Sequence, residues 1–129
     1  MSKNQCKKYG NYNEYNCYNN TQKFTVESRT QFTVIVNSEN LCNLLTLIGN
    51  EDINLDGFLL QSLNDNCTLF TFTVGNANGQ PSTWLGIVRC ILKKLCINHL
   101  ENDVAKITAS SSGPGTLAKI YCALSAELD

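Results

Sequence analysis

Four segments of the chain combine β-branched and aromatic residues with an alternation of apolar and polar positions. In the first of them Phe32, Val34 and Val36 share one face, and threonines share much of the other. The turn "NDN" at 64–66 joins the second and third segments and predicts an antiparallel hairpin. Strands that are apolar on one face only indicate a sheet with one covered face. The predicted strands are residues 31–37, 53–63, 67–75 and 104–109.

Three other segments place apolar residues at helical spacing and predict amphipathic helices. Ser38 and Ser82 offer N-caps to the first two helices, and Gly49 with Asn50 ends the first. Pro114 fits near the start of the third, because the first helical turn needs no amide donor from it. The apolar stripes are Leu41, Leu44, Leu45 and Ile48 in the first helix, Trp84, Ile87, Val88, Ile91 and Leu95 in the second, and Leu117, Ile120, Tyr121 and Leu124 in the third.

The predicted order of elements is β-α-β-β-α-β-α. Its first six elements form the ferredoxin-like βαββαβ arrangement, an α+β fold with one four-stranded antiparallel sheet and two helices on one face. The seventh element is an extra C-terminal helix. Residues 1–28 are rich in Asn, Tyr and Cys, and the first 23 contain no Val, Ile, Leu or Phe, so we predict a disordered tail there. Residues 29–129 form the predicted domain.

The bulk composition excludes several classes of function. The chain has 129 residues, enough for one core, and a net charge of −1, which gives no long-range attraction for nucleic acid or an anionic membrane. Its apolar runs are too short to span a bilayer, and no apolar segment of a secretory signal follows the N-terminal lysines. An odd count of seven cysteines without a CxxC pair argues against a secreted disulfide scaffold. We therefore expect a cytoplasmic protein.

The segment from Phe32 to Ala109 resembles an ACT-like domain. The resemblance rests on "FTVIVNSENLCNLLTLIG", "INLDGFLLQSL", "TLFTFTV" and a final strand that ends in "VAKIT". It implies a non-catalytic regulatory or small-ligand-binding module that self-associates through its sheet, usually as a homodimer. One departure is clear: the family commonly has an Asp/Asn-x-Pro-Gly-x-Leu turn after the first strand, and residues 37–41 lack the Pro-Gly.

Carried over by position, the resemblance implies a ligand site at the first strand–helix turn. The implied ligand is a small, amino-acid-like molecule, often bound across a dimer interface. Backbone amides at a helix N-terminus suit its carboxylate. The alternative is that Asn37 and Ser38 only cap the helix. The implied ligand-binding residues are Asn37, Ser38, Asn40 and Leu41, with Gly57 on the facing strand.

The end of the chain, "KITASSSGPGTLAKIYCAL", resembles the Pro-Gly turn that the first unit lacks. On this interpretation the fourth strand also leads into the opening of a second, partial ACT-like repeat. The simpler interpretation is a helix that follows an ordinary Gly/Pro loop.

No arrangement of residues predicts catalysis, a metal site or a cofactor. His99 is the sole histidine, and we expect it to be exposed in a loop before the fourth strand. A thiol–imidazole pair with Cys90 or Cys96 is conceivable, but spacing along the chain supplies no geometry for it. Cys90 and Cys96 are six residues apart, which places them on different faces of a helix and disfavours metal binding. We predict that the protein is not an enzyme.

The N-terminal tail supports an alternative function. Tyrosines recur every three residues from Tyr9 to Tyr18, with Cys6 and Cys17 among them. Tyrosine and cysteine are the side chains that oxidative cross-linking uses, and such tails resemble those of bacterial spore-coat and other envelope proteins. The alternative is thus a structural assembly protein with a cross-linking arm, located in the spore coat.

Overall fold

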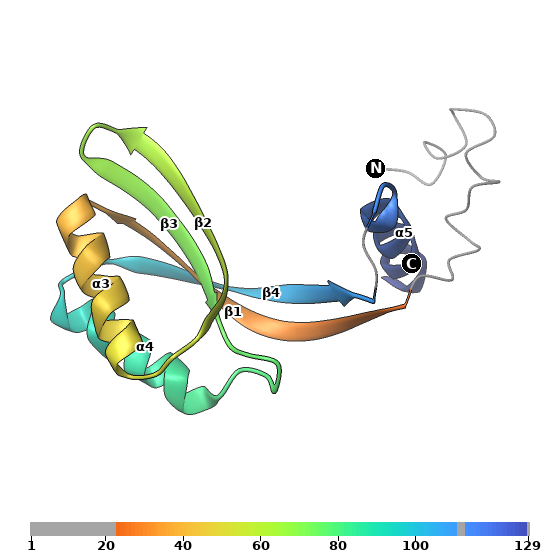
Figure 1. The fold of residues 1–129 in the computed structure, drawn as a ribbon, viewed down its shortest axis with the longest axis horizontal. Helices are drawn as coiled ribbons and strands as arrows, with labels where there is room; N and C mark the ends of the chain where they lie inside the picture. Colours follow the sequence, from red (N-terminus) through yellow and green to blue (C-terminus); the bar gives the residue numbers. More distant parts are fainter. Residues whose placement is uncertain (1–22, 111–112, 129) are drawn as a thin grey trace. The chain divides into compact units, whose positions relative to one another are not determined.

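The computed structural model describes residues 23–110 and 113–128 of the chain. Figure 1 shows the elements in these ranges. Their bounds are β1 Phe24–Val36, α3 Ser38–Asn50, β2 Leu55–Asn64, β3 Cys67–Val74, α4 Ser82–Lys94, β4 His99–Ala109 and α5 Thr116–Leu128. This order confirms the predicted succession of strands and helices. No helix in the described residues is long and apolar enough to cross a membrane.

The described residues group into two compact units. The larger unit is Glu27–Lys106, which contains α3, β2, β3 and α4 in full. The smaller unit comprises residues 23–26, 107–110 and 113–128, and so holds the first residues of β1, the last residues of β4 and α5.

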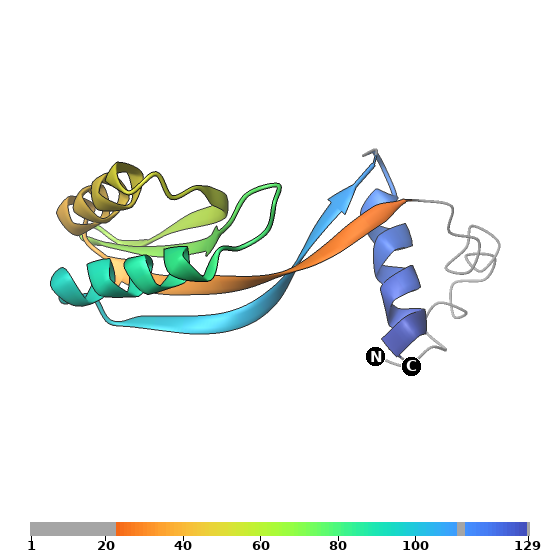
Figure 2. The same cartoon turned by 90° about the horizontal axis from the view of Figure 1, so that it is seen from below.

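In the larger unit the four described strands form one antiparallel sheet in the order β2-β3-β1-β4. β1 pairs with β3 from Gln31 to Val36, and β3 pairs with β2 on its other side. Helices α3 and α4 both pack against one face of this sheet (Figure 2). Strand order and helix placement confirm the ferredoxin-like α+β fold.

The core of the larger unit lies between the helices and the covered face of the sheet. The ring centroids of Phe32 and Phe72 are 5.2 Å apart, and those of Phe70 and Phe72 are 5.0 Å apart. Full burial of such a side chain stabilises a fold by about 1.5–3 kcal/mol. The largest fully buried side chains are Phe32, Phe70, Phe72, Leu44, Ile48, Leu92, Val34, Val74 and Val88.

Two strands begin earlier than the sequence predicts. β1 starts at Phe24, so residues 24–28, which the sequence places in the tail, belong to a strand; residues 1–22 lie outside the described residues. β4 starts at His99 instead of near Val104. In β1, Phe24 and Val26 alternate with polar residues as in a strand, whereas β4 begins with polar residues, among which Glu101 accepts hydrogen bonds from Arg89. The division into a tail of residues 1–28 and a domain of residues 29–129 otherwise stays a prediction.

Candidate functional site

Asn37, between β1 and α3, is the N-cap of the helix. Its backbone is extended, and its side-chain oxygen accepts a hydrogen bond of 2.7 Å from the Asn40 amide. The first helical bond follows, from the Leu41 amide to the Asn37 carbonyl at 3.0 Å. The predicted cap at Ser38 is therefore wrong by one residue. At α4 the cap position is Pro81 and no side chain bonds there, so the predicted cap at Ser82 is also wrong.

The cap leaves part of the helix start open for a ligand. The amides of Ser38 and Glu39 have no carbonyl partner within the helix, because a helix leaves its first N–H groups unbonded. Both residues are exposed. Glu39 puts an acidic side chain in the first turn, which opposes a purely anionic ligand and is compatible with a zwitterion.

A groove of about 520 Å³ opens beside this helix start, and we call it the turn groove. Ile35, Leu69 and Leu100 supply apolar surface, and Ile35 and Leu100 are 59% and 67% exposed. Asparagine, threonine, cysteine and histidine side chains make its polar part. The full lining is Thr33, Ile35, Val36, Asn40, Leu69, Cys96, Ile97, Asn98, His99 and Leu100.

The structure brings only one predicted site residue into the lining of the turn groove. Asn40 lines it, whereas Asn37 and Ser38 adjoin it in sequence, and Leu41 packs against the core. Gly57 lies farther along the sheet: it pairs with Thr73, which pairs with Gln31, six positions before Asn37. Within one chain, Gly57 is therefore not at the turn.

Sequence reasoning missed the other wall of the turn groove, residues 96–100. Cys96 follows α4 with φ of 57°, the left-handed conformation that commonly ends a helix and usually belongs to glycine. Because a cysteine stands there, the sequence shows no stop signal at this position. This tight turn is followed closely by β4, and the first residue of β4, His99, lines the groove.

His99 is the first residue of β4 and is half-buried, so the predicted exposed loop position is wrong. Its ring lies 5.6 Å from that of Phe32, and its Nε2 is 2.8 Å from Glu101 Oε2. Glu101 also accepts hydrogen bonds from the guanidinium of Arg89 at 2.8–3.2 Å. These bonds from Arg89 outweigh burial and lower the pKa of Glu101 to about 2. Glu101 therefore holds the His99 ring in place.

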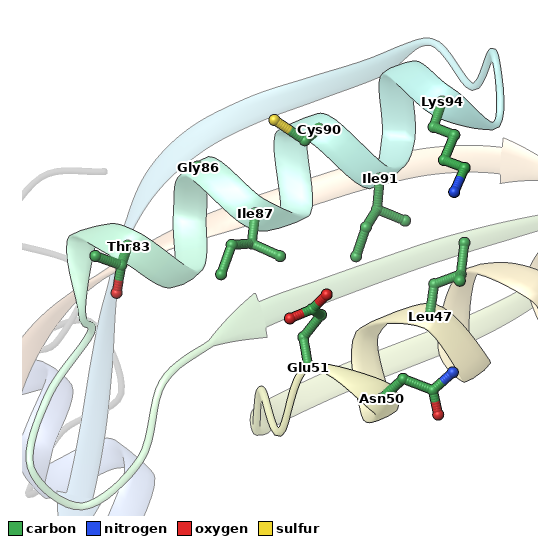
Figure 3. Close-up of a pocket in the computed structure, with 9 residues that line it drawn as sticks. All are labelled: Leu47, Asn50, Glu51, Thr83, Gly86, Ile87, Cys90, Ile91 and Lys94. Carbon is green, nitrogen blue, oxygen red and sulfur yellow. The ribbon is translucent and has the colours of Figure 1, made fainter.

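A second groove, of about 810 Å³, lies between α3 and α4 (Figure 3). Figure 3 shows Ile87 and Ile91 pointing toward α3 and Leu47 pointing toward α4, while Cys90 points away. Glu51 and Lys94 flank this apolar floor. The groove offers few convergent polar groups, so it is less suited than the turn groove to a small polar ligand.

A buried charged cluster crosses the uncovered side of the sheet in the larger unit. Asp56 Oδ2 accepts from Arg29 Nε at 2.9 Å and from Lys106 Nζ at 2.8 Å, while Oδ1 accepts from Thr73 Oγ1 at 2.7 Å. The remaining Arg29 groups donate to Glu27 at 3.3 Å and to two backbone carbonyls at 2.9 Å. The side chains of Arg29 and Asp56 are 1% and 6% exposed. Because these charges are bound to one another and nearly buried, the cluster stabilises the sheet and offers little to a ligand.

The charged cluster makes the free energy of unfolding depend on pH. Burial alone raises the pKa of Asp56, but hydrogen bonds from Lys106, Thr73 and Arg29 outweigh it and lower the pKa to about 2. Since the folded-state pKa lies below the unfolded value, the contribution is complete above about pH 5 and is lost as pH falls toward 2. We expect a loss of about 2 kcal/mol over this window. Urea unfolding at several pH values between 6 and 2 measures this loss. The free energy of unfolding should fall less steeply with decreasing pH in Asp56→Asn than in the wild type, and an equally steep fall contradicts the assignment.

No group of three or more His, Cys, Asp and Glu side chains in residues 23–110 and 113–128 could hold a metal ion. Within the same ranges the cysteines at 42, 67, 90 and 96 form no disulfide, and those at 42, 90 and 96 are exposed. Cys96 and His99 both line the turn groove.

No protein-family model matches the chain, and no curated protein matches its sequence. Solved structures do resemble it. The regulatory subunit of aspartate kinase from Thermus thermophilus matches with a TM-score of 0.52 at 15% identity, over 82% of this chain and 74% of that one. Protein BT0572 from Bacteroides thetaiotaomicron matches with a TM-score of 0.52 at 20% identity, over 79% of this chain and 65% of its own. The aspartokinase alpha and beta subunits match with a TM-score of 0.50 at 17% identity, over 81% and 73%.

Identities this low show the fold alone. The chain is an α+β protein with a ferredoxin-like unit, the class of fold that regulatory subunits of aspartate kinase share.

Proposed function

We propose that the chain is a non-catalytic regulatory module of ACT-like type. It binds a small, amino-acid-like ligand in the turn groove and self-associates through the sheet of its larger unit. The observation that carries the proposal is a groove beside the β1–α3 turn that is lined by Asn40 and an apolar wall and lies next to the helix start with its open amides. The resemblance to regulatory subunits supports it at the level of the fold.

The chemistry of the turn groove suits a zwitterion with an apolar side chain. The amides of Ser38 and Glu39 would bind the carboxylate, and the Glu39 carboxylate would attract the ammonium group. Ile35, Leu69 and Leu100 would pack against the side chain. Asn40 would fix the orientation by hydrogen bonds through its amide side chain.

Self-association would use the uncovered surfaces of the sheet. β2 is an edge strand with exposed apolar side chains on both faces: Phe58, Leu59 and Leu60 are 68%, 63% and 50% exposed. An exposed apolar edge of this kind pairs readily with another strand. Gly57 would reach a ligand only from the β2 of a second copy, as the proposed site across a dimer interface requires.

Ligand binding is testable by thermal shift with each of the twenty amino acids. At a hundredfold excess over its dissociation constant, a true ligand stabilises the fold by about 2.7 kcal/mol. Asn40→Ala should remove most of the shift, whereas Asn43→Ala on the exposed side of α3 should keep it. A shift that survives Asn40→Ala, or no shift with any amino acid, contradicts the proposed site.

A second candidate function, a structural assembly protein, is favoured by the thiols. Cys42, Cys90 and Cys96 are free and exposed in the described part of the chain, so disulfide cross-links between copies are sterically open. The Tyr/Cys-rich arm that the sequence predicts lies outside the described residues. Extraction that depends on a reducing agent distinguishes this function from ligand sensing.

A further inference from the structure

The described part of the smaller unit contains half of the elements of a ferredoxin-like unit. The larger unit has four strands and two helices, whereas the described part of the smaller unit has two strand ends and one helix, α5. In the larger unit each central strand, β1 or β3, is followed by a helix, and the edge strands are β2 and β4. Of the two strand ends described in the smaller unit, residues 107–109 are followed by a helix and residues 24–26 are not, so the former correspond to a central strand and the latter to an edge strand.

The two strand ends form a ribbon with one apolar face. The Ser110 amide donates to the Lys23 carbonyl at 3.0 Å. In an antiparallel pair this places Phe24 opposite Ala109 and Val26 opposite Ile107, with the threonines at 25 and 108 on the other face.

The ribbon has room for a further strand on the side of residues 107–109. β4 is the last strand of the sheet among the described residues, so its outer edge has no strand beside it there. A strand edge of this kind is a template for pairing with another chain.

Apolar surface of the smaller unit stays uncovered. Ile120 of α5 is only 4% exposed, whereas Leu117 and Tyr121 on the same apolar stripe are 76% and 65% exposed. On the ribbon, Val26 and Ile107 are 48% and 37% exposed. The apolar stripe of α5 is therefore buried at Ile120 and open to solvent at Leu117 and Tyr121.

The charges of this surface permit it to meet its own copy. Across a two-fold axis the same surface meets itself, so a surface that carried several charges of one sign would repel its copy. The surface formed by residues 24–26, 107–109 and 116–126 carries a single charge, on Lys119. Lys119 is two residues from both Leu117 and Tyr121, which places it on the opposite side of the helix from them. Tyr121 is 65% exposed and would bury roughly 100–160 Å² more when covered. With Leu117, Val26 and Ile107 it supplies much of the roughly 800 Å² per partner that a stable dimer needs.

We propose that two copies of the smaller unit complete one ferredoxin-like unit between them. Residues 107–109 of the two copies pair antiparallel about a two-fold axis near Thr108, with residues 24–26 of each copy at the outer edges and both α5 helices on one face. The interface goes beyond the proposed ligand site and is separate from self-association through β2. Two different two-fold interfaces on one chain build assemblies larger than a dimer.

Cysteine cross-linking tests the pairing directly. In Thr108→Cys the two thiols would stand at the axis, where antiparallel Cα atoms are about 4.5–5.5 Å apart and a disulfide fits. Thr25→Cys is the matched control, since it is the same exchange at an exposed position on the same face but away from the axis. Mild oxidation of the full chain should give a dithiothreitol-reversible dimer band with Thr108→Cys, above the wild-type background, and not with Thr25→Cys. Equal cross-linking of both variants, or of neither, overturns the proposal.

Sedimentation velocity separates this interface from the β2 edge. The full chain with Leu59→Lys should remain a dimer through the smaller unit, and adding Leu117→Lys should weaken that dimer about 30-fold or more. Leu45→Lys, an exposed leucine on α3, is the control for the substitution and should leave assembly unchanged.

If Leu59→Lys alone gives monomers, self-association through the sheet survives and the proposal fails. If Leu117→Lys alone gives monomers while Leu59→Lys has no effect, the proposal survives and association through β2 fails. If the wild-type chain and every variant are monomers, the proposal fails. A dimer that forms only when residues 1–22 are deleted would show that this segment blocks the ribbon, which also overturns the proposal.

Discussion

Replacing Asp56 by alanine is expected to lower the free energy of unfolding by about 3–5 kcal/mol. The reason is the Arg29 guanidinium, which stays charged at any ordinary pH and whose side chain is 1% exposed. Burial lowers the pKa of Arg29, but its hydrogen bonds to Asp56 and Glu27 raise it overall. Without Asp56, this cation and that of Lys106 lose their shared partner inside the protein.

Urea denaturation at pH 7 measures the loss, and Glu101→Ala provides the matched control. Arg89 and Glu101 also form an ion pair with several hydrogen bonds, but the Arg89 side chain is 48% exposed. Removing an exposed pair costs roughly 0–1 kcal/mol. Equal losses in the two variants would show that burial does not set the strength of the Asp56 cluster.

The fold was predictable because its apolar pattern is regular. Phe32, Phe70 and Phe72 alternate with threonines and are all buried on one face. Leu44 and Ile48 of the first predicted stripe are likewise buried, although Leu45 on the same stripe is 40% exposed. Periodicity fixes which face of an element is apolar, and it leaves open how far a neighbour covers that face.

The buried cluster was not predictable, because its members are far apart in sequence. Arg29, Asp56 and Lys106 meet only once β1, β2 and β4 lie in one sheet. In the sequence, Arg29 interrupts the apolar alternation, so the pattern predicts a strand that starts at Gln31. The register that joins these charges depends on an irregularity of β2 between Leu55 and Gly57.

The candidate site was predictable in part. The helix start after β1 follows from local pattern, and Asn40 does line the turn groove. The opposite wall depends on the left-handed Cys96, for which no local residue preference exists. Sequence reasoning also placed Gly57 at the facing strand, and the register puts it level with Gln31.

Replacing Gly75 by alanine is expected to cost about 2–4 kcal/mol, because the Arg29 side chain occupies the space of a Cβ. A Cβ at position 75 would lie 2.5 Å from Arg29 Nε and 3.0 Å from the Gly79 carbonyl oxygen. Arg29 is held by several hydrogen bonds and cannot move aside without breaking the bond to Asp56. The methyl group therefore disrupts the same cluster that Asp56→Ala disrupts.

A double-mutant cycle with Arg29→Ala distinguishes this coupling from a simple backbone effect. In the Arg29→Ala background, Gly75→Ala should cost less than half as much, because the side chain that it displaces is gone. Gly86→Ala is the control of opposite sign: its Cβ meets nothing within 4 Å inside α4, so it should stabilise the helix by about 0.5–1 kcal/mol. Equal costs of Gly75→Ala in both backgrounds would assign the effect to the turn at Gly75–Gly79 and remove Arg29 from the explanation.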